Sequence, residues 1–110
     1  MSTTTDVYES TFLCVVHPGG ILGDELDELG ISARELARQI NVPANRITQI
    51  IRGQRGISGD TALRLGHWFG MSAEFWMNLQ KTYELNLARS QVGEEVENLP
   101  RRELAEEAAE

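Results

Sequence analysis

The sequence predicts an all-α fold, a five-helix helix-turn-helix domain over residues 17–89. Three observations support this prediction. Residues 32–53 form two short amphipathic segments joined by a turn signal, and capping residues and glycine stops mark three further helices around them. The excess of positive charge is confined to residues 31–70, which contain six arginines and two acidic residues. We expect an N-terminal arm at 1–16 and an acidic tail at 90–110.

The first helix is expected to begin at Pro18 and to stop at Gly30. Apolar residues recur in it at helical intervals, and its other face is acidic. Because carboxylates are repelled by a phosphate backbone, the acidic face should point away from nucleic acid. The apolar residues are Ile21, Leu22, Leu26 and Leu29, and the acidic ones are Asp24, Glu25, Asp27 and Glu28.

The helix-turn-helix itself begins at Ser32, which has the spacing of a capping box with Glu35. Asn41 stands at the corner, where the chain reverses and where Asn tolerates a left-handed backbone. Pro43 has the fixed φ that is favoured at a first helical position, and Gly53 ends the second helix. The two helices should cross closely at the small residue Ala37 and enclose Leu36, Ile40, Val42, Ile47 and Ile50.

The outer face of the second helix is predicted to be a recognition surface. Its short or planar polar side chains can hydrogen-bond base edges or phosphates in a major groove. The alternative interpretation is a merely solvated face in a small helical bundle. We assign the contacts that read the base sequence of DNA to Asn45, Arg46 and Gln49. We assign contacts with the phosphates to Arg34, Arg52 and Arg55. The whole outer face consists of Ala44, Asn45, Arg46, Thr48 and Gln49.

Two more helices complete the domain. Arg55 lies in a glycine-flanked loop, 54–56, whose backbone amides can approach a phosphate. Ser58 caps a helix that stops at Gly70, and His67 within it is expected to be an ordinary, partly buried histidine. Ser72 caps the longest helix, 73–89.

The longest helix is apolar on more than one side, because Leu85 lies opposite the stripe that begins at Trp76. One subunit cannot bury both sides, so we expect a homodimer. The alternative is that loops or tails of the same chain cover the extra face. The residues assigned to the dimer interface are Phe75, Trp76, Leu79, Tyr83 and Leu87.

The two ends of the chain carry fewer signals. A β-favouring run at 11–16 predicts a short extended segment, which either covers its own domain or pairs with another chain. Cys14 and His17 have the spacing of half a metal site, but one cysteine and two histidines cannot complete it, so no metal or other cofactor is expected. The tail, 90–110, is expected to be frayed, disordered or a short exposed helix.

Composition excludes several classes of protein. No apolar run is long enough to cross a bilayer, no basic signal-peptide start is present, and a single cysteine suits a reducing compartment, so a cytoplasmic location is expected. No catalytic triad, phosphate-binding loop or paired carboxylates are evident, and we therefore expect no enzymatic activity.

Five motifs occur together and in order. They are H-P-G at 17–19, V-P-A-N-R-I at 42–47, R-G-I at 55–57, D-T-A-L-R-L at 60–65 and E-F-W-M-N-L-Q at 74–80. With them the chain resembles the HigA-type antitoxin family, within the XRE-like helix-turn-helix repressor superfamily. The resemblance covers residues 17–89 and implies a domain of the repressor type.

The resemblance implies a bacterial, nucleoid-associated homodimer that binds an inverted-repeat operator in double-stranded DNA and represses its own operon. It also implies a protein partner, a HigB-type toxin, which is an mRNA endonuclease of RelE-like fold. A stand-alone repressor without a toxin is the alternative, since the same residues would bind DNA in either case. Gly20 replaces a Glu that is common in the family, and Ala33 replaces a Gln that often reaches DNA, which shifts backbone anchoring to Ser32 and Arg34. The resulting candidate DNA-binding set is Ser32, Arg34, Ala44, Asn45, Arg46, Thr48, Gln49, Arg52 and Arg55.

Overall fold

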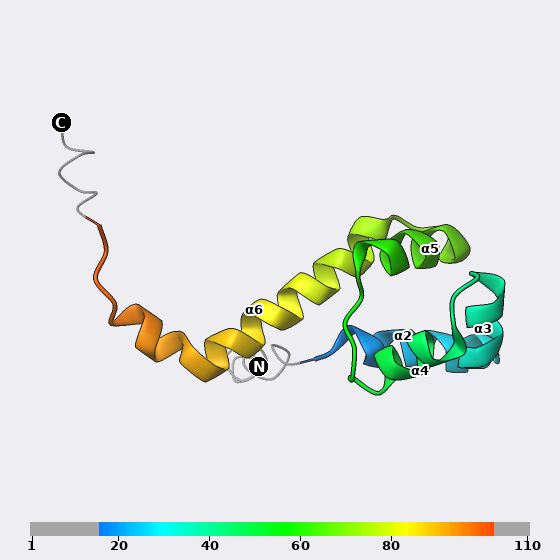
Figure 1. Cartoon of the computed structure of the whole chain (residues 1–110), viewed down its shortest axis with the longest axis horizontal. Coiled ribbons are helices and arrows are strands. Elements are labelled where there is room, and N and C mark those ends of the chain that lie inside the picture. Colours follow the sequence, from blue (N-terminus) through cyan, green and yellow to red (C-terminus); the bar gives the residue numbers. More distant parts are fainter. Residues whose placement is uncertain (1–15, 103–110) are drawn as a thin grey trace, which may run out of the picture.

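The computed structural model describes residues 16–102 as an all-α chain, which confirms the predicted fold class. This part of the chain contains five helices, which are labelled in Figure 1. They are α2 (Pro18–Leu29), α3 (Ala33–Gln39), α4 (Ala44–Ile51), α5 (Gly59–Phe69) and α6 (Ala73–Glu97). Cys14 and nearly all of the predicted extended segment, 11–16, lie outside the described residues.

Side chains cap the starts of four helices. Serine hydroxyls accept a backbone N–H at the starts of α3, α5 and α6, from Ser32, Ser58 and Ser72 respectively. The Nδ1 atom of His17 does the same for α2, accepting from Gly19 N at 2.8 Å. Pro43 precedes α4 with φ −62° and ψ 145°. It is therefore the N-cap of α4, one residue earlier than the first helical position predicted, because its extended ψ excludes it from the helix.

The first four helices end in one common way. A residue with positive φ follows each helix, and the N–H of the next residue donates to the carbonyl five residues before it. At the predicted corner this residue is Asn41, with φ 61°, and Val42 N donates to Ala37 O at 3.0 Å. The corresponding residues after the other three helices are Gly30, Gly53 and Gly70.

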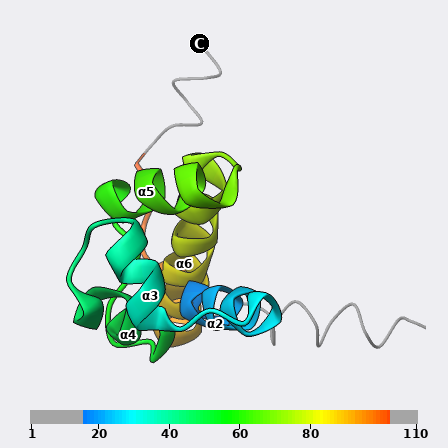
Figure 2. The same cartoon turned by 90° about the vertical axis from the view of Figure 1, so that its right-hand side faces the viewer.

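The core is formed where α2, α3 and α4 meet the N-terminal half of α6 and α5. Figure 2 shows α6 running behind the other helices from α5 to α2. Ala37 is 1 % exposed, as expected for the residue at which α3 and α4 cross. The contact of α2 with α4 is also close, since a Cβ atom on Gly19 would lie 1.8 Å from Ile50 O. The buried core residues are Leu22, Leu26, Leu36, Ala37, Ile40, Ile47, Ile50, Ile57, Ala62, Leu65 and Trp76.

Helix α6 continues to Glu97, eight residues beyond the predicted end at Arg89. Gly93 does not interrupt it, and the helix stops only as the chain approaches Pro100, which disfavours a helical conformation in the residue before it. The C-terminal half of α6 projects away from the other helices (Figure 1). Over residues 16–102, no helix has both the length and the apolar composition needed to span a membrane.

Candidate nucleic-acid interface

The packing of α4 against the core determines which of its side chains face outward. Ile47 and Ile50 are fully buried against the core, so the residues at the start of the helix and on its far side face outward. Ala44 and Asn45 are exposed, and Arg46, Thr48 and Gln49 are partly buried. Thr48 Oγ1 donates to Ala44 O at 3.2 Å, which uses its proton within the helix.

The three arginines assigned to phosphate contacts are all exposed. Arg34 lies in the first turn of α3, Arg52 follows the last turn of α4, and Arg55 lies in the loop before α5. None of the three forms an ion pair within residues 16–102. Their charges are therefore available to a phosphate backbone.

Ser32 and Glu35 form half of the predicted capping box. Ser32 Oγ accepts from Glu35 N at 3.0 Å. The Glu35 carboxylate accepts from Arg38 and Gln39. The hydrogen bonds from Arg38, and then the one from Gln39, hold the pKa of Glu35 down to about 2. Ser32 is thus the N-cap of α3, and its hydroxyl oxygen accepts from the helix start.

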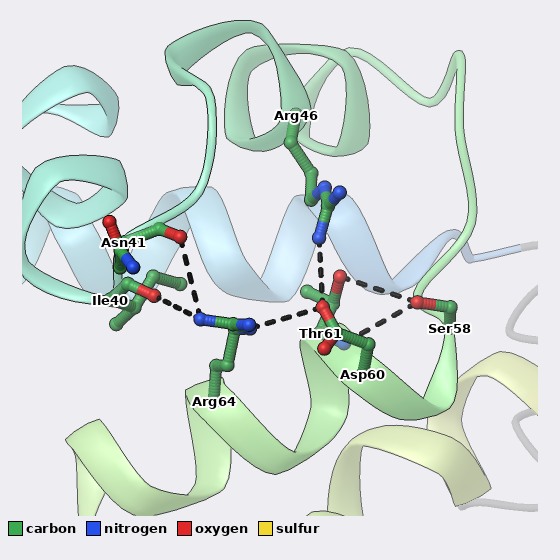
Figure 3. A network of polar contacts seen from close by, with 7 residues as sticks. All are labelled: Ile40, Asn41, Arg46, Ser58, Asp60, Thr61 and Arg64. Atoms are coloured by element: carbon green, nitrogen blue, oxygen red, sulfur yellow. Dashed lines mark hydrogen bonds and ion pairs between the residues drawn. The ribbon is translucent and has the colours of Figure 1, made fainter.

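Arg46 differs from the other candidate base-reading residues, because its side chain crosses from α4 to the first turn of α5 (Figure 3). Its Nη1 atom donates to Asp60 Oδ2 at 2.9 Å, and the side chain is 27 % exposed. Its Nε atom is buried and has no hydrogen-bond acceptor. The sequence grouped Arg46 with Asn45 and Gln49, but only the structure reveals this intramolecular ion pair.

Arg64 is a further residue of the site that sequence reasoning missed. Its Nε atom donates to Asp60 Oδ2 at 3.1 Å, and its Nη1 atom donates to Ile40 O at 2.9 Å and to Asn41 O at 3.4 Å. Arg64 therefore satisfies carbonyl groups at the end of α3, in the turn of the helix-turn-helix. The i, i+4 spacing of Asp60 and Arg64 could have predicted their pairing, but not the contact with the turn.

The network lowers the pKa of Asp60, chiefly through the hydrogen bond from Arg64 and then through Arg46. Beside it lies an open cleft of about 600 Å³, between the turn, the loop before α5 and the start of α5. Its walls include Arg46, Arg55 and Arg64. The cleft thus places three guanidinium groups and one carboxylate next to α4.

A second contact, from α6, holds the loop that carries Arg55. Ile57 N donates to Gln80 Oε1 at 2.8 Å, and Gln80 is 6 % exposed. A Cβ atom on Gly56 would lie 2.6 Å from Gln80 Nε2, so glycine permits this close approach. No sequence pattern indicated that an α6 side chain would hold this loop in place.

The residues assigned to the dimer interface are not all on the surface. Trp76 is fully buried in the core of its own subunit, so it offers no surface to a second one. Leu79 packs partly against the same core, and the Tyr83 ring contacts His17 with a centroid distance of 4.7 Å. Leu87 is partly buried, and Phe75 is 40 % exposed.

His67, expected to be partly buried, is exposed in the last turn of α5. Within residues 16–102, no group of three or more His, Cys, Asp or Glu residues could hold a metal ion.

Comparison with known proteins places this geometry in a family. The helix-turn-helix family profile matches residues 22–76. The virulence-associated protein I of Dichelobacter nodosus is 49 % identical over 74 residues, which are 66 % of this chain and 68 % of that protein.

Solved structures give the same result. An addiction module antidote protein of the HigA family from Coxiella burnetii is 43 % identical, with a TM-score of 0.77 over 79 % of this chain and 97 % of that one. The Pseudomonas aeruginosa antitoxin HigA, solved with the higBA promoter, is 47 % identical, with a TM-score of 0.77 over 81 % and 98 % of the two chains. The chain therefore belongs to the helix-turn-helix family and, within it, to the HigA family.

Proposed function

We propose that this protein is the antitoxin of a type II toxin-antitoxin system, that it represses its own operon by binding operator DNA, and that it neutralises a HigB/RelE-like mRNA endonuclease. The observation that carries the DNA-binding part is the outer face of α4, flanked by the exposed Arg34, Arg52 and Arg55. The similarity to a HigA solved with promoter DNA supports it. This role places the protein with the chromosome, in the bacterial cytoplasm at the nucleoid.

The proposed DNA complex is a homodimer on an inverted repeat. Two recognition helices related by a two-fold axis would enter successive major grooves about 34 Å apart. Three side chains of α4, Asn45, Arg46 and Gln49, would contact base edges. Phosphates would be contacted by Arg34, Arg52 and Arg55. The four acidic residues of α2 lie outside this surface, which avoids repulsion of the DNA; they are Asp24, Glu25, Asp27 and Glu28.

The test of operator binding compares Gln49→Ala with Arg55→Ala on a duplex containing the promoter of the chain's own gene. Gln49→Ala is expected to cost about 1–3 kcal/mol on this duplex and far less on random DNA. Arg55→Ala is expected to weaken both complexes about equally and to reduce the salt dependence by roughly one unit of slope. Unchanged operator discrimination in Gln49→Ala would show that the recognition surface is wrongly assigned.

The proposal for toxin binding rests on the distribution of charge. Residues 1–30 contain six acidic residues and no Lys or Arg, and 90–110 contain seven Glu and two Arg, whereas the arginines of the helix-turn-helix lie between them. A protein that binds RNA is expected to be basic, so opposite fields would speed the encounter. The surfaces for DNA and toxin are thus proposed to be separate.

Two truncations test this separation, one lacking residues 1–16 and the other lacking 90–110. Removing 90–110 also removes the end of α6 and with it part of a candidate subunit contact, so operator affinity is compared per dimer. Both truncations are expected to keep this affinity, and at least one should lose most of its affinity for the toxin. If both bind the toxin like the full chain, the contacts lie in the helical core. If no toxin encoded beside the gene binds at all, the protein is a stand-alone repressor.

A further inference from the structure

Asp60 lies at the centre of the polar network in Figure 3 and has no part in the proposed DNA contacts. A single oxygen, Oδ2, accepts from Arg46 at 2.9 Å and from Arg64 at 3.1 Å. The Asp60 side chain remains 54 % exposed, and the cleft beside it also contains Arg55. A carboxylate therefore stands beside the recognition helix, where a phosphate backbone is proposed to approach.

The two arginines depend on Asp60 to different degrees. Arg64 is also anchored by Ile40 O at 2.9 Å, so its position does not require the carboxylate. Asp60 is the one ion-pair partner of Arg46 within residues 16–102, and the buried Nε atom of Arg46 has no acceptor. An unpaired buried N–H group is unfavourable, so stability alone does not account for holding Arg46 inward.

We infer that Asp60 is a specificity-determining positioning residue: it holds Arg46 in one orientation for the operator and prevents its charge from binding phosphates of any sequence. Asp60 Oδ2 accepts one N–H of the Arg46 guanidinium, as a phosphate oxygen would, so the carboxylate competes with random DNA for this charge. This inference rests on the proposed operator binding.

The experiment measures binding of full-length Asp60→Asn to a duplex of the chain's own promoter and to a random duplex of equal length, at several salt concentrations. Asparagine keeps an oxygen that can accept from Arg64, and it removes the charge. Random-DNA affinity should rise, its salt slope should steepen by roughly one, and the ratio of operator to random affinity should fall roughly three- to tenfold. In the double variant Arg46→Ala/Asp60→Asn, the salt slope should return to that of the wild type.

Glu74→Gln is the matched control. Glu74 and Asp60 are both the second residue of a helix that follows a serine N-cap, so both substitutions remove the same favourable charge from a helix start. Glu74 lies on α6, outside the cleft, and Glu74→Gln should leave the ratio and both salt slopes unchanged.

A purely structural role for Asp60 predicts a different result. Both affinities would then fall together with the melting temperature, and an unchanged ratio would overturn the inference. Should Asp60→Asn fail to fold, Arg46→Ala with Asp60 intact gives the answer. It should lower operator affinity and leave the random-DNA salt slope unaltered, and a slope shallower by about one would overturn the inference.

The proposed function can fail separately. A wild-type protein that binds its promoter no better than random DNA would overturn operator binding. The random-DNA slopes of Asp60→Asn and wild type would still decide whether Asp60 withholds the charge of Arg46.

Discussion

The two adjacent glycines at the start of α2 differ in the space available for a side chain. A methyl group on Gly19 would collide with the carbonyl of Ile50, whereas a methyl group on Gly20 would meet nothing within 4 Å. Gly19→Ala is therefore expected to destabilise the protein by at least about 1–3 kcal/mol, because α2 must move away from α4. Gly20→Ala should stabilise it by roughly 0.5–1 kcal/mol, since alanine has less freedom to lose in the unfolded chain. Chemical denaturation of both variants measures the difference, and equal effects would contradict the close approach of the two helices.

His17 predicts a pH dependence of stability. Its Nδ1 atom accepts a hydrogen bond from the Gly19 N–H, and its ring packs against Tyr83. Burial lowers the pKa of His17 below the usual 6.5. The unfolded chain then binds a proton more readily than the folded one. The contribution of His17 to the free energy of unfolding is therefore complete above pH 6.5. It is lost as the pH falls through the lower pKa of the folded state.

Unfolding free energies between pH 5 and 8 test this prediction. His17→Asn keeps a capping acceptor that does not titrate, so the free energy of unfolding should change less with pH than in the wild type. Ser72→Asn, which replaces another N-cap residue with the same acceptor and removes no titrating group, is the control and should follow the wild-type profile. A His17→Asn profile as steep as that of the wild type would exclude this role.

At the residue scale, local signals were predictable and contacts between helices were not. Asn41 could be predicted at the turn because few residue types other than glycine tolerate a left-handed backbone, and asparagine is one of them. The Arg46 to Asp60 pair joins residues 14 apart, and its geometry depends on how α5 packs against the helix-turn-helix. Sequence patterns define the faces of single helices, so they could not reveal that this arginine is already paired.

At the scale of elements, Gln80 connects the longest helix to the loop that carries Arg55. Gln80→Leu would leave the buried Ile57 N–H without an acceptor and should cost about 1–3 kcal/mol. It should also weaken DNA binding through the loosened loop. Lys81→Leu changes the neighbouring exposed residue and should have little effect on stability. Thermal melts and operator titrations of the two variants provide the comparison, and equal stability would contradict the proposed anchoring.

The helix starts were predictable to within one residue, because each has a local signal, either a capping side chain such as Ser58 or Ser72 or a proline such as Pro43. The end of α6 was not predictable in this way, because Gly93 and the acidic residues of the tail indicate a helix end that does not occur there. Trp76 illustrates a second limit. The stripe from Trp76 was correctly placed on one face, but periodicity cannot distinguish a face buried by the same subunit from one buried by a partner.

For the whole molecule, the projecting half of α6 predicts how two subunits associate. Leu85, Val92 and Val96 are 49 %, 42 % and 53 % exposed. At 100° per residue they fall within about 40° of one another around the helix, which makes a continuous apolar stripe. Such a stripe is unfavourable in water and is buried when two copies of the helix pack along it.

The double variant Leu85→Asp/Val92→Asp should therefore be monomeric at micromolar concentration, because a dimer would have to bury four carboxylates. Operator affinity should fall at least about a hundredfold, since a single recognition helix reads only one half-site. The core is untouched, so the melting temperature of the monomer at low concentration should resemble that of the wild type. Gln91→Asp, on the same half of α6 but about 120° around the helix from Leu85 at the centre of the stripe, is the control and should remain dimeric. Sedimentation equilibrium with operator titration makes the measurement. A double variant that still forms dimers would place the subunit contact on another surface, with the exposed Phe75 as the next residue to substitute.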